Sequence, residues 1–377
     1  MRSALPNTSS CLPIPHLEPG MQNFSDTCSK PAIAPALLRW WKMHGRKDLP
    51  WQQDPTPYRV WVSEIMLQQT QVVTVERYFD RFIAAFPGVT ALANATADEV
   101  LHLWSGLGYY RRGRNLHCAA RMVRDQYGGV LPTNYDELLK LPGIGRSTAG
   151  AILALSAGQR VPILDGNVRR VLLRVHGIED WAGSAPVAKR LWSLAEASTP
   201  RHRVAQYTQA IMDLGATVCT GRKPDCERCP LASICIARAS GSAERIPARR
   251  NRKPRPRKTT VLALAIVENQ VLLEKRPPSG IWGGLWSFPE FPDAAAVSQW
   301  CQARFGRPPS ATTAWPVVSH SFSHFDLDIT PVEITVNDAG GQCVDDARWL
   351  WYNIDTPAKI GLAAPVAQLL QAIGDRT

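Results

Sequence analysis

The chain contains the segment CTGRKPDCERCPLASIC at residues 219–235, whose four cysteines follow the spacing C-x6-C-x2-C-x5-C. Thiols this close together would be strained as nested disulfides, and clustered sulfur ligands select zinc or an iron–sulfur cluster. Structural zinc sites commonly pair two C-x2-C knuckles across a longer loop, whereas only Cys226 and Cys229 form one here. The spacing therefore favours an iron–sulfur cluster over zinc. The expected ligands are Cys219, Cys226, Cys229 and Cys235.

The composition is that of a globular protein with two or three domains. Its 377 residues are 45% hydrophobic and 20% charged, and such a length supports more than one core. No apolar run reaches the length of about eighteen residues that a membrane-spanning helix needs. Residues 1–35 lack the apolar segment of a secretory signal, and we expect a disordered tail, or an extension upstream of a start at Met21. Thiol ligands without such a signal indicate a reducing cytoplasm.

The positive charge of the chain is concentrated in one segment. Between Glu244 and Lys258 there are eight Lys or Arg residues and one acid, a net +7 of the total +11. Prolines interrupt this run and prevent a helix. Residues 240–258 are therefore predicted to form an extended basic linker between two folded bodies. Its position favours contact with phosphate over the alternative of a merely solvated tether.

Residues 36–239 carry a helical pattern, in which apolar residues recur at intervals of three and four. The segment Leu141–Gly145, of sequence LPGIG, interrupts this pattern before a helix of small residues resumes at Ser147. Such an interrupted pair of helices is a helix–hairpin–helix. Glycine N–H groups at the start of a helix suit an anionic phosphate oxygen, so Gly143 and Gly145 are candidate contacts to a nucleic acid backbone.

After the basic segment the pattern changes to strands. A continuous apolar run at Val261–Val267 and a second at Val271–Leu273 predict a hairpin. Residues 259–377 are therefore predicted to form a separate α+β domain. Further strands are expected near Trp315–Val318, Phe325–Val336 and Arg348–Tyr352, and helices near Ala294–Arg304 and Pro365–Ile373.

Two carboxylic acids stand at positions suited to catalysis. Glu64 lies between Val62 and Ile65 in a segment too apolar for a surface helix. Burial raises the pKa of a carboxyl group, so Glu64 could hold a proton near neutral pH and act as a general acid; the alternative is a buried ion pair with an arginine. Asp165 stands at a helix start, where an aspartate commonly caps the helix. Two carboxylates that flank a cleft are also the usual apparatus for cleaving a glycosidic bond.

The joint set of motifs resembles the endonuclease III superfamily of DNA glycosylases, and within it the adenine DNA glycosylases, which remove adenine mispaired with 8-oxoguanine. The resemblance covers the chain from Ala36 to about Asp375. It implies a multidomain protein, in which an all-α helix–hairpin–helix DNA glycosylase domain with a [4Fe-4S] cluster loop precedes an α+β Nudix-like domain. The motifs that carry it are Glu64, Gly106–Tyr110, Leu141–Gly145, Leu164–Val168 and the four cysteines.

The resemblance implies a role for each matching residue. Glu64 would protonate N7 of adenine, and Asp165 would stabilise the positive charge at C1′, electrostatically or by transient covalent attachment, before water completes hydrolysis. The base must first leave the stack. Members of the implied adenine pocket are Trp51, Gln52, Ser147, Asn167 and Gln209, the last at a position where the family also uses an acid. Members of the implied DNA contact are Gln69, Leu107, Tyr109, Gly143 and Gly145.

Core packing is the alternative role for Leu107 and for the nearby Tyr110.

The residue after Arg146 separates two classes of the superfamily. Glycosylases with lyase activity place a lysine after the position of Arg146, where its amine forms a Schiff base with the sugar. Here Ser147 occupies that position, so a monofunctional glycosylase is expected. The alternatives are a bifunctional endonuclease III-type lyase and a non-catalytic iron–sulfur DNA-binding protein.

The C-terminal domain resembles Nudix folds that bind 8-oxoguanine nucleotides. Gly284 and Glu290 have the opening spacing of the hydrolase motif, but residues 294–306 contain no acid, and a divalent cation needs several carboxylate oxygens. The domain is therefore expected to recognise 8-oxoguanine rather than hydrolyse a nucleotide, through Phe322, Ser323 and His324. The expected partner is double-stranded DNA with A:8-oxoguanine or A:G mispairs, bound by a monomer on the nucleoid in the cytoplasm.

Overall fold

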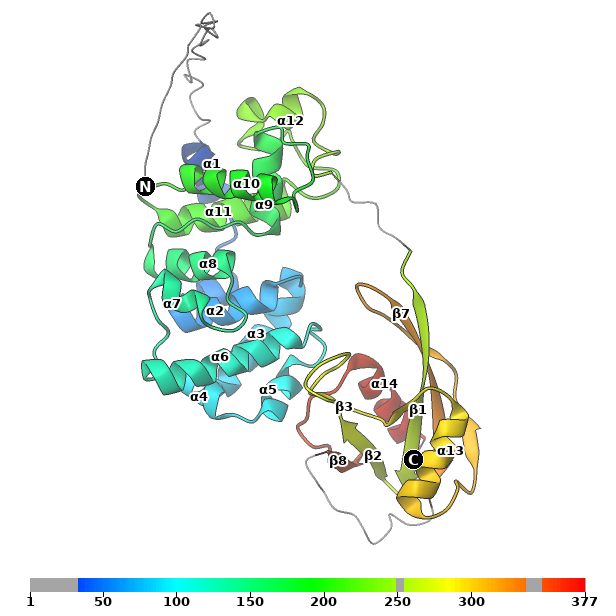
Figure 1. Cartoon of the computed structure of the whole chain (residues 1–377). Helices are drawn as coiled ribbons and strands as arrows, with labels where there is room; N and C mark the ends of the chain where they lie inside the picture. Colours follow the sequence, from blue (N-terminus) through cyan, green and yellow to red (C-terminus); the bar gives the residue numbers. More distant parts are fainter. Residues whose placement is uncertain (1–32, 249–253, 337–347, 377) are drawn as a thin grey trace, which may run out of the picture. The chain divides into compact units, whose positions relative to one another are not determined.

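The computed structural model describes residues 33–248, 254–336 and 348–376 (Figure 1). The predicted N-terminal tail, up to residue 32, and residues 249–253 of the predicted linker lie outside these ranges. The first helix, α1 (Ile33–His44), begins three residues before the predicted start of the helical pattern. Within the described ranges, the helices are too short or too polar to cross a membrane.

The helical part has two hydrophobic cores. Trp61, Phe79 and Trp104 belong to the first core, and Leu172 and Leu214 to the second. In Figure 1 the helices α2–α8 form one group, and α1 with α9–α12 forms the other. The first group comprises α2 (Pro57–Leu67), α3 (Val72–Ala85), α4 (Val89–Asn94), α5 (Ala97–Trp104), α6 (Arg111–Tyr127), α7 (Tyr135–Leu139) and α8 (Arg146–Ala157). The second adds α9 (Gly166–Val175), α10 (Ala185–Ser198), α11 (Val204–Thr217) and α12 (Ile236–Ala239), and two 3-10 turns are η1 (Pro50–Gln52) and η2 (Ala232–Ile234).

The helix–hairpin–helix is formed by α7 and α8, as predicted. Gly143 has a φ of +86°, a left-handed conformation that disfavours side chains. Gly145 is the N-cap residue of α8, and because it has no side chain, no side chain covers the N-terminus of this helix. Helix α8 packs against both α2 and α11, so it connects the two groups of helices. This central place brings α2 and the start of α9 to the same side of the domain, where the predicted catalytic residues lie.

The C-terminal part is a mixed sheet between two helices. Its strands are β1 (Arg257–Val267), β2 (Gln270–Lys275), β3 (Trp286–Ser287), β4 (Glu290–Phe291), β5 (Thr312–Ala314), β6 (Val318–Ser321), β7 (Asp326–Thr335) and β8 (Trp349–Asn353). The main order is β3-β2-β1-β7-β5, with β4 on β1, β6 on β7 and β8 on β2. Strands β1 and β7 are parallel, and β1 and β2 form the predicted hairpin. Helix α13 (Ala294–Phe305) packs on one face and α14 (Ala364–Gly374) on the other.

Two sequence-based expectations for this part were wrong in detail. The strand expected at Trp315–Val318 is a break between β5 and β6, because Pro316 has no N–H to donate to a sheet. The basic linker was expected to reach residue 258, but β1 already begins at Arg257. In this region Arg255 and Arg257 form ion pairs with Asp326 and Asp328 of β7, at 3.4 and 3.2 Å. These two cations are therefore engaged by the domain itself.

Candidate active site

Glu64 lies near the end of α2, a helix that is buried around most of its circumference. Thr56 caps this helix by accepting a hydrogen bond from the N–H of Arg59, and apolar neighbours on both sides of Glu64 enter the core. Burial, and secondarily the charge of Asp165, raise the pKa of Glu64 to about 8. The alternative of an ion pair is not realised, because no salt bridge between described residues includes Glu64. This side chain therefore holds a proton near neutral pH.

Asp165 caps the N-terminus of α9, as the sequence predicted. Its Oδ1 accepts a hydrogen bond from the N–H of Val168 at 2.7 Å, and its Oδ2 accepts one from Nδ2 of Asn167 at 3.2 Å. Burial raises the pKa of Asp165, whereas these donors and the positive charge of Arg170 oppose that rise. Donors of this kind favour the ionised form. Asp165 thus has donors that favour its charged form, which Glu64 lacks among the causes that set its pKa.

Ser147 connects the hairpin to the loop that carries Asp165. Its Oγ accepts a hydrogen bond from the N–H of Leu164 at 3.1 Å. The two segments approach closely at Gly150, where a Cβ would stand only 2.5 Å from the carbonyl oxygen of Pro162. The residue that replaces the lyase lysine therefore has a structural partner, and a hydroxyl group cannot form a Schiff base with a sugar.

A cavity of about 230 Å³ lies beside α2 and α11. It brings together three of the five residues predicted for the adenine pocket, namely Trp51, Gln52 and Gln209. The other two, Ser147 and Asn167, do not line it and instead contact the segment around Asp165. The remaining lining residues are Trp41, Lys47, Pro55, Val60, Ser63, Leu155, Ala205 and Gln206.

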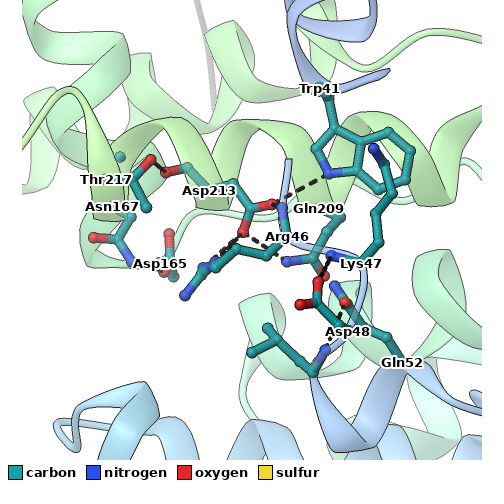
Figure 2. Close-up of polar contacts among 12 residues, drawn as sticks. Trp41, Arg46, Lys47, Asp48, Gln52, Asp165, Asn167, Gln209, Asp213 and Thr217 are labelled. Carbon is teal, nitrogen blue, oxygen red and sulfur yellow. Dashed lines mark hydrogen bonds and ion pairs between the residues drawn. The ribbon is translucent and has the colours of Figure 1, made fainter. Parts of the chain in front are cut away.

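Sequence reasoning missed three residues beside this cavity. Lys47 lines it, and Arg46 forms an ion pair with Asp213, whose side chain is fully buried in α11 (Figure 2). The carboxylate of Asp213 accepts hydrogen bonds from both Arg46 and Gln209. The available signal was that Asp213 is the single charged residue of α11 and stands between Met212 and Leu214, a signal similar to the one that identified Glu64 in α2.

Two loops present the residues predicted to enter the DNA duplex. Gln69 follows α2 and Tyr109 precedes α6, and both have left-handed backbones, with φ values of 58° and 47°. Such values are uncommon for residues with side chains. Gln69 is exposed, and Tyr109 is 49% exposed. Leu107, in contrast, is only 5% exposed within the first core, which favours the packing alternative for this residue; Tyr110 also packs against that core.

Arg112 joins these two loops. Its guanidinium group donates hydrogen bonds to the carbonyl oxygens of Ile65, Met66 and Gln68 at the end of α2. It also donates to the hydroxyl of Thr70 and to the carbonyl oxygens of Leu107 and Gly108. Burial lowers the pKa of Arg112 to about 10. Arg112 thus holds the backbone of both loops.

The four cysteines line one small cavity between α9 and the loop of residues 219–235. Burial, and secondarily the charges of the other three cysteines, raise the pKa of Cys229 to about 11. Within residues 33–248, 254–336 and 348–376, no group of three or more His, Cys, Asp or Glu is arranged to hold a single metal ion. The four thiols face one shared cavity, and four cysteine ligands around one space are what a cubane iron–sulfur cluster needs.

Arg174 supplies positive charge at this cavity. Its side chain is 1% exposed, and its Nη1 donates to Sγ of Cys219 at 3.3 Å. Its Nη2 is buried and has no hydrogen-bond partner among the described residues. A buried cation with a free donor beside four thiols fits an anionic iron–sulfur cluster, whose sulfur atoms accept hydrogen bonds. The residues present therefore fit the predicted cofactor.

Phe322, Ser323 and His324 form the turn between β6 and β7. The N–H of Phe322 donates to the carbonyl oxygen of Phe325 at 2.9 Å, which closes the turn. The rings of Phe322 and Phe325 stack with centroids 4.5 Å apart, whereas Ser323 and His324 are exposed. The residues predicted to read 8-oxoguanine thus stand at a rigid, accessible tip of the sheet.

Glu290 is occupied by partners within the domain. Its carboxylate forms an ion pair with Arg276 at 2.6 Å and accepts a hydrogen bond from Thr260 at 2.9 Å. Helix α13, which follows it, contains no acid. The single glutamate that matches the hydrolase motif therefore joins β4 to Arg276 and to β1 within the sheet.

Comparison with protein families defines the class of the chain. The family model described as "HhH-GPD superfamily base excision DNA repair protein" matches residues 62–197. The model "Iron-sulfur binding domain of endonuclease III" matches residues 219–235, and "NUDIX domain" matches residues 261–372. The fold and the site are thus those of a base excision DNA glycosylase with an iron–sulfur cluster and a Nudix-like domain.

Curated relatives narrow this class. An adenine DNA glycosylase of Buchnera aphidicola (subspecies Acyrthosiphon pisum) is 40% identical, over 89% of this chain and 95% of the relative. The adenine DNA glycosylase of Homo sapiens is 37% identical, over 81% of this chain and 67% of the relative. A solved thermostable thymine-DNA glycosylase is 28% identical with a TM-score of 0.49, over 55% of this chain and 95% of that chain. The chain belongs to the adenine DNA glycosylase family, whose members carry a [4Fe-4S] cluster.

Proposed function

We propose that this chain excises adenine opposite 8-oxoguanine or guanine in double-stranded DNA, as a monofunctional glycosylase. The observation that carries the proposal is the pair of carboxyl groups at the junction of α2, α8 and α9. Glu64 has its pKa raised to about 8, while Asp165 is held by two hydrogen-bond donors. A protonated acid beside a stabilised carboxylate is what hydrolysis of an N-glycosidic bond requires.

Each group has one task in the proposed reaction. Glu64 transfers its proton to N7 of the extruded adenine, so that the bond between base and sugar breaks with a neutral leaving group. Asp165 then faces the positive charge that develops at C1′, and a carboxylate in a water-poor site is worth several kcal/mol there. Water adds to C1′ and gives up a proton, which the Glu64 carboxylate takes back. Because Ser147 supplies no amine, the sugar is released without strand cleavage.

Recognition of the base and of its partner is proposed to use separate parts of the chain. The cavity of Trp51, Gln52 and Gln209 would take the extruded adenine, since its size suits one base. Gln69 and Tyr109 would occupy the duplex where the base has left, because both stand exposed on the loops that Arg112 holds. The turn at Phe322–His324 would contact 8-oxoguanine. The Ser323 hydroxyl would accept a hydrogen bond from the N7–H group, which guanine lacks.

The cluster is proposed to organise the loop of residues 219–235 for DNA contact. Its ligands would be the four cysteines, and a bound cluster supplies a rigid cross-link of that loop. Arg222, Lys223 and Arg228 lie on the same loop and suit phosphate. The proposed domains are residues 36–239 for catalysis, 240–258 for the linker and 259–377 for recognition, in a monomer that acts on DNA in the cytoplasm.

The test is single-turnover excision by the cluster-loaded protein, with adenine placed opposite 8-oxoguanine, G, C or T. We expect release of adenine opposite 8-oxoguanine and G, with strand cleavage appearing only after alkali. Cleavage without alkali, together with covalent trapping by borohydride, would show the bifunctional lyase instead. Binding of all four duplexes without release of base would show a non-catalytic DNA-binding protein.

A further inference from the structure

Asp213 is a fully buried carboxylate that accepts five hydrogen bonds (Figure 2). Its Oδ2 accepts from the indole N–H of Trp41 at 3.2 Å and from the backbone N–H of Arg46 at 3.0 Å. Its Oδ1 accepts from Nε and Nη2 of Arg46 at 2.8 and 2.6 Å, and from Nε2 of Gln209 at 2.9 Å. Every group around this carboxylate is therefore a donor.

This arrangement fixes which end of the Gln209 amide faces the carboxylate. An ionised carboxylate only accepts hydrogen bonds. If the amide of Gln209 were rotated, its oxygen would stand 2.9 Å from Oδ1 of Asp213. The two negatively charged oxygen atoms would then repel each other, because no hydrogen atom lies between them. The Gln209 nitrogen is therefore turned toward Asp213, and its oxygen is left for the cavity that the side chain lines.

Arg46 makes this orientation stable. A buried carboxylate is costly unless a counter-charge and hydrogen bonds compensate it, and Arg46 supplies both through its side chain and its backbone. The same contact joins helix α11 to the segment that contains Arg46 and leads into η1. Lys47 of this segment, and Trp51 and Gln52 of η1, line the cavity. Residues 167 positions apart in the sequence are thus fixed to one another at the cavity.

We propose that Asp213, with Arg46, is a positioning residue that turns the oxygen of Gln209 toward the extruded base and thereby selects bases with an amino group at C6. The exocyclic N6 of adenine is a donor, whereas O6 of guanine is an acceptor. A hydrogen-bond acceptor held in the cavity therefore stabilises bound adenine through N6 and repels O6 of guanine. The inference rests on the proposed function, because it assumes that the cavity receives the base.

The experiment compares release of adenine with release of purine, which lacks the amino group, each opposite 8-oxoguanine. Single-turnover rate constants are measured for the full, cluster-loaded chain. In Asp213→Asn the introduced amide has one oxygen to offer to donors on both sides, so Gln209 loses its fixed orientation. We expect the ratio of adenine to purine rate constants to fall about tenfold, the usual scale for one hydrogen bond to a base. Because intrinsic reactivity of the two bases cancels between variants, only recognition moves this ratio.

A double-mutant cycle tests whether Asp213 acts through Gln209. Gln209→Met should give a similar fall in the ratio, and Asp213→Asn combined with Gln209→Met should give no further fall. The matched control is Asp48→Asn, which neutralises an exposed carboxylate whose contact is the backbone N–H of Lys47; its ratio should equal that of the wild type. Arg46→Lys keeps the charge but loses the two-point contact, and it provides the same test with a smaller change if Asp213→Asn does not fold.

If Asp213→Asn left the ratio of adenine to purine rate constants unchanged and lowered both rates, Asp213 would be only structural and the inference would be overturned. Additive falls in the double variant would also overturn it, because Asp213 would then act independently of Gln209. Failure of the wild type to release adenine from any duplex would instead overturn the proposed function, and this inference with it.

Discussion

The negative charge of Asp165 raises the pKa of Glu64, which burial has already raised, to about 8. The carboxylate of Asp165 accepts hydrogen bonds from the N–H of Val168 and from Nδ2 of Asn167, whereas the carboxyl group of Glu64 has no side-chain hydrogen bond within the described part of the chain. The donors therefore favour the ionised form of Asp165, whereas burial favours the protonated form of Glu64. The two carboxyl groups differ because hydrogen-bond donors surround Asp165 and not Glu64. This difference favours an acid at Glu64 and an anion at Asp165.

The first prediction concerns the dependence of activity on pH. Because Glu64 must be protonated, the rate constant for adenine release should be constant below about pH 8 and fall about tenfold per unit above it. Single-turnover excision between about pH 6 and pH 10 measures this. A rate constant that stayed level across this range would remove Glu64 from the role of general acid. As a control, NMR titration of Glu64 in Asp165→Asn should show a lower pKa than in the wild type, because the raising charge is gone.

The second prediction is that Glu64 destabilises the fold at neutral pH. Its pKa rises from 4.5 to about 8 on folding, so the folded state must keep a proton that the unfolded state releases. The wild type therefore loses stability as pH rises from 4.5 to about 8. Glu64→Gln removes this cost and should raise the free energy of unfolding at about pH 7 by up to about 3 kcal/mol.

Denaturant unfolding of the wild type and Glu64→Gln at about pH 5 and about pH 8 checks the sign. The difference should be small at the lower pH and larger at the higher one. A variant that is less stable than the wild type at the higher pH would contradict the raised pKa. The same variant should lose at least about a hundredfold in adenine release, the usual scale for a lost general acid, so stability and activity change in opposite directions.

The sequence predicted those features that depend on local pattern. The helix–hairpin–helix at Leu141–Gly145 and the cap at Asp165 follow from residue types that act on their own backbone, and both are present. The acid at Glu64 was found because its neighbours in the same helix are apolar. The contacts of Arg112 with the end of α2, and of Asp213 with Arg46 and Trp41, could not be found in this way. These partners lie 42 to 47 positions from Arg112, and 167 and 172 positions from Asp213. Only the packed fold brings such residues together.

The third prediction tests Arg112 as the link between the two DNA loops. Arg112→Met removes the donors that hold the carbonyl oxygens of Gln68 and Leu107, so the left-handed conformations at Gln69 and Tyr109 lose their support. We expect affinity for mismatch duplex to fall at least about tenfold and adenine release to slow. Arg111→Met is the matched control, since Arg111 is the exposed neighbour in α6. If both variants lost affinity equally, charge rather than loop support would be the cause.

The fourth prediction concerns Ser147. The wild type should give no covalent product with borohydride, because its hydroxyl forms no iminium ion. Ser147→Lys places an amine at the start of α8 beside the Leu164–Asp165 loop, and it should give a borohydride-trapped complex with DNA, at a yield lowered by loss of the hydrogen bond from Leu164. Ser147→Met, of similar length, controls for that loss. Trapping by the wild type would show that another lysine performs lyase chemistry.

The fifth prediction concerns how the partner of adenine is read. Adenine is a normal base, so its removal is safe only if the opposite base is shown to be oxidised, and the cavity beside Gln209 is proposed to receive only the adenine. The exposed tip at Phe322–His324 is closed by a backbone hydrogen bond and stacked on Phe325, so it offers Ser323 in a fixed position. In the full chain, Phe322→Ala with Ser323→Ala should reduce the preference for 8-oxoguanine over guanine about ten- to a hundredfold.

The measurement is the ratio of single-turnover rate constants for A:8-oxoguanine and A:G duplexes at one salt concentration. Ser321→Ala is the matched control, because it removes a hydroxyl from the same hairpin that is already bonded to Asp326 at 2.7 Å; its ratio should match the wild type. Iron content should be equal in all three proteins, since the change is remote in sequence from the cysteines. A double variant that still discriminated as well as the wild type would place recognition of the oxidised base elsewhere in the chain.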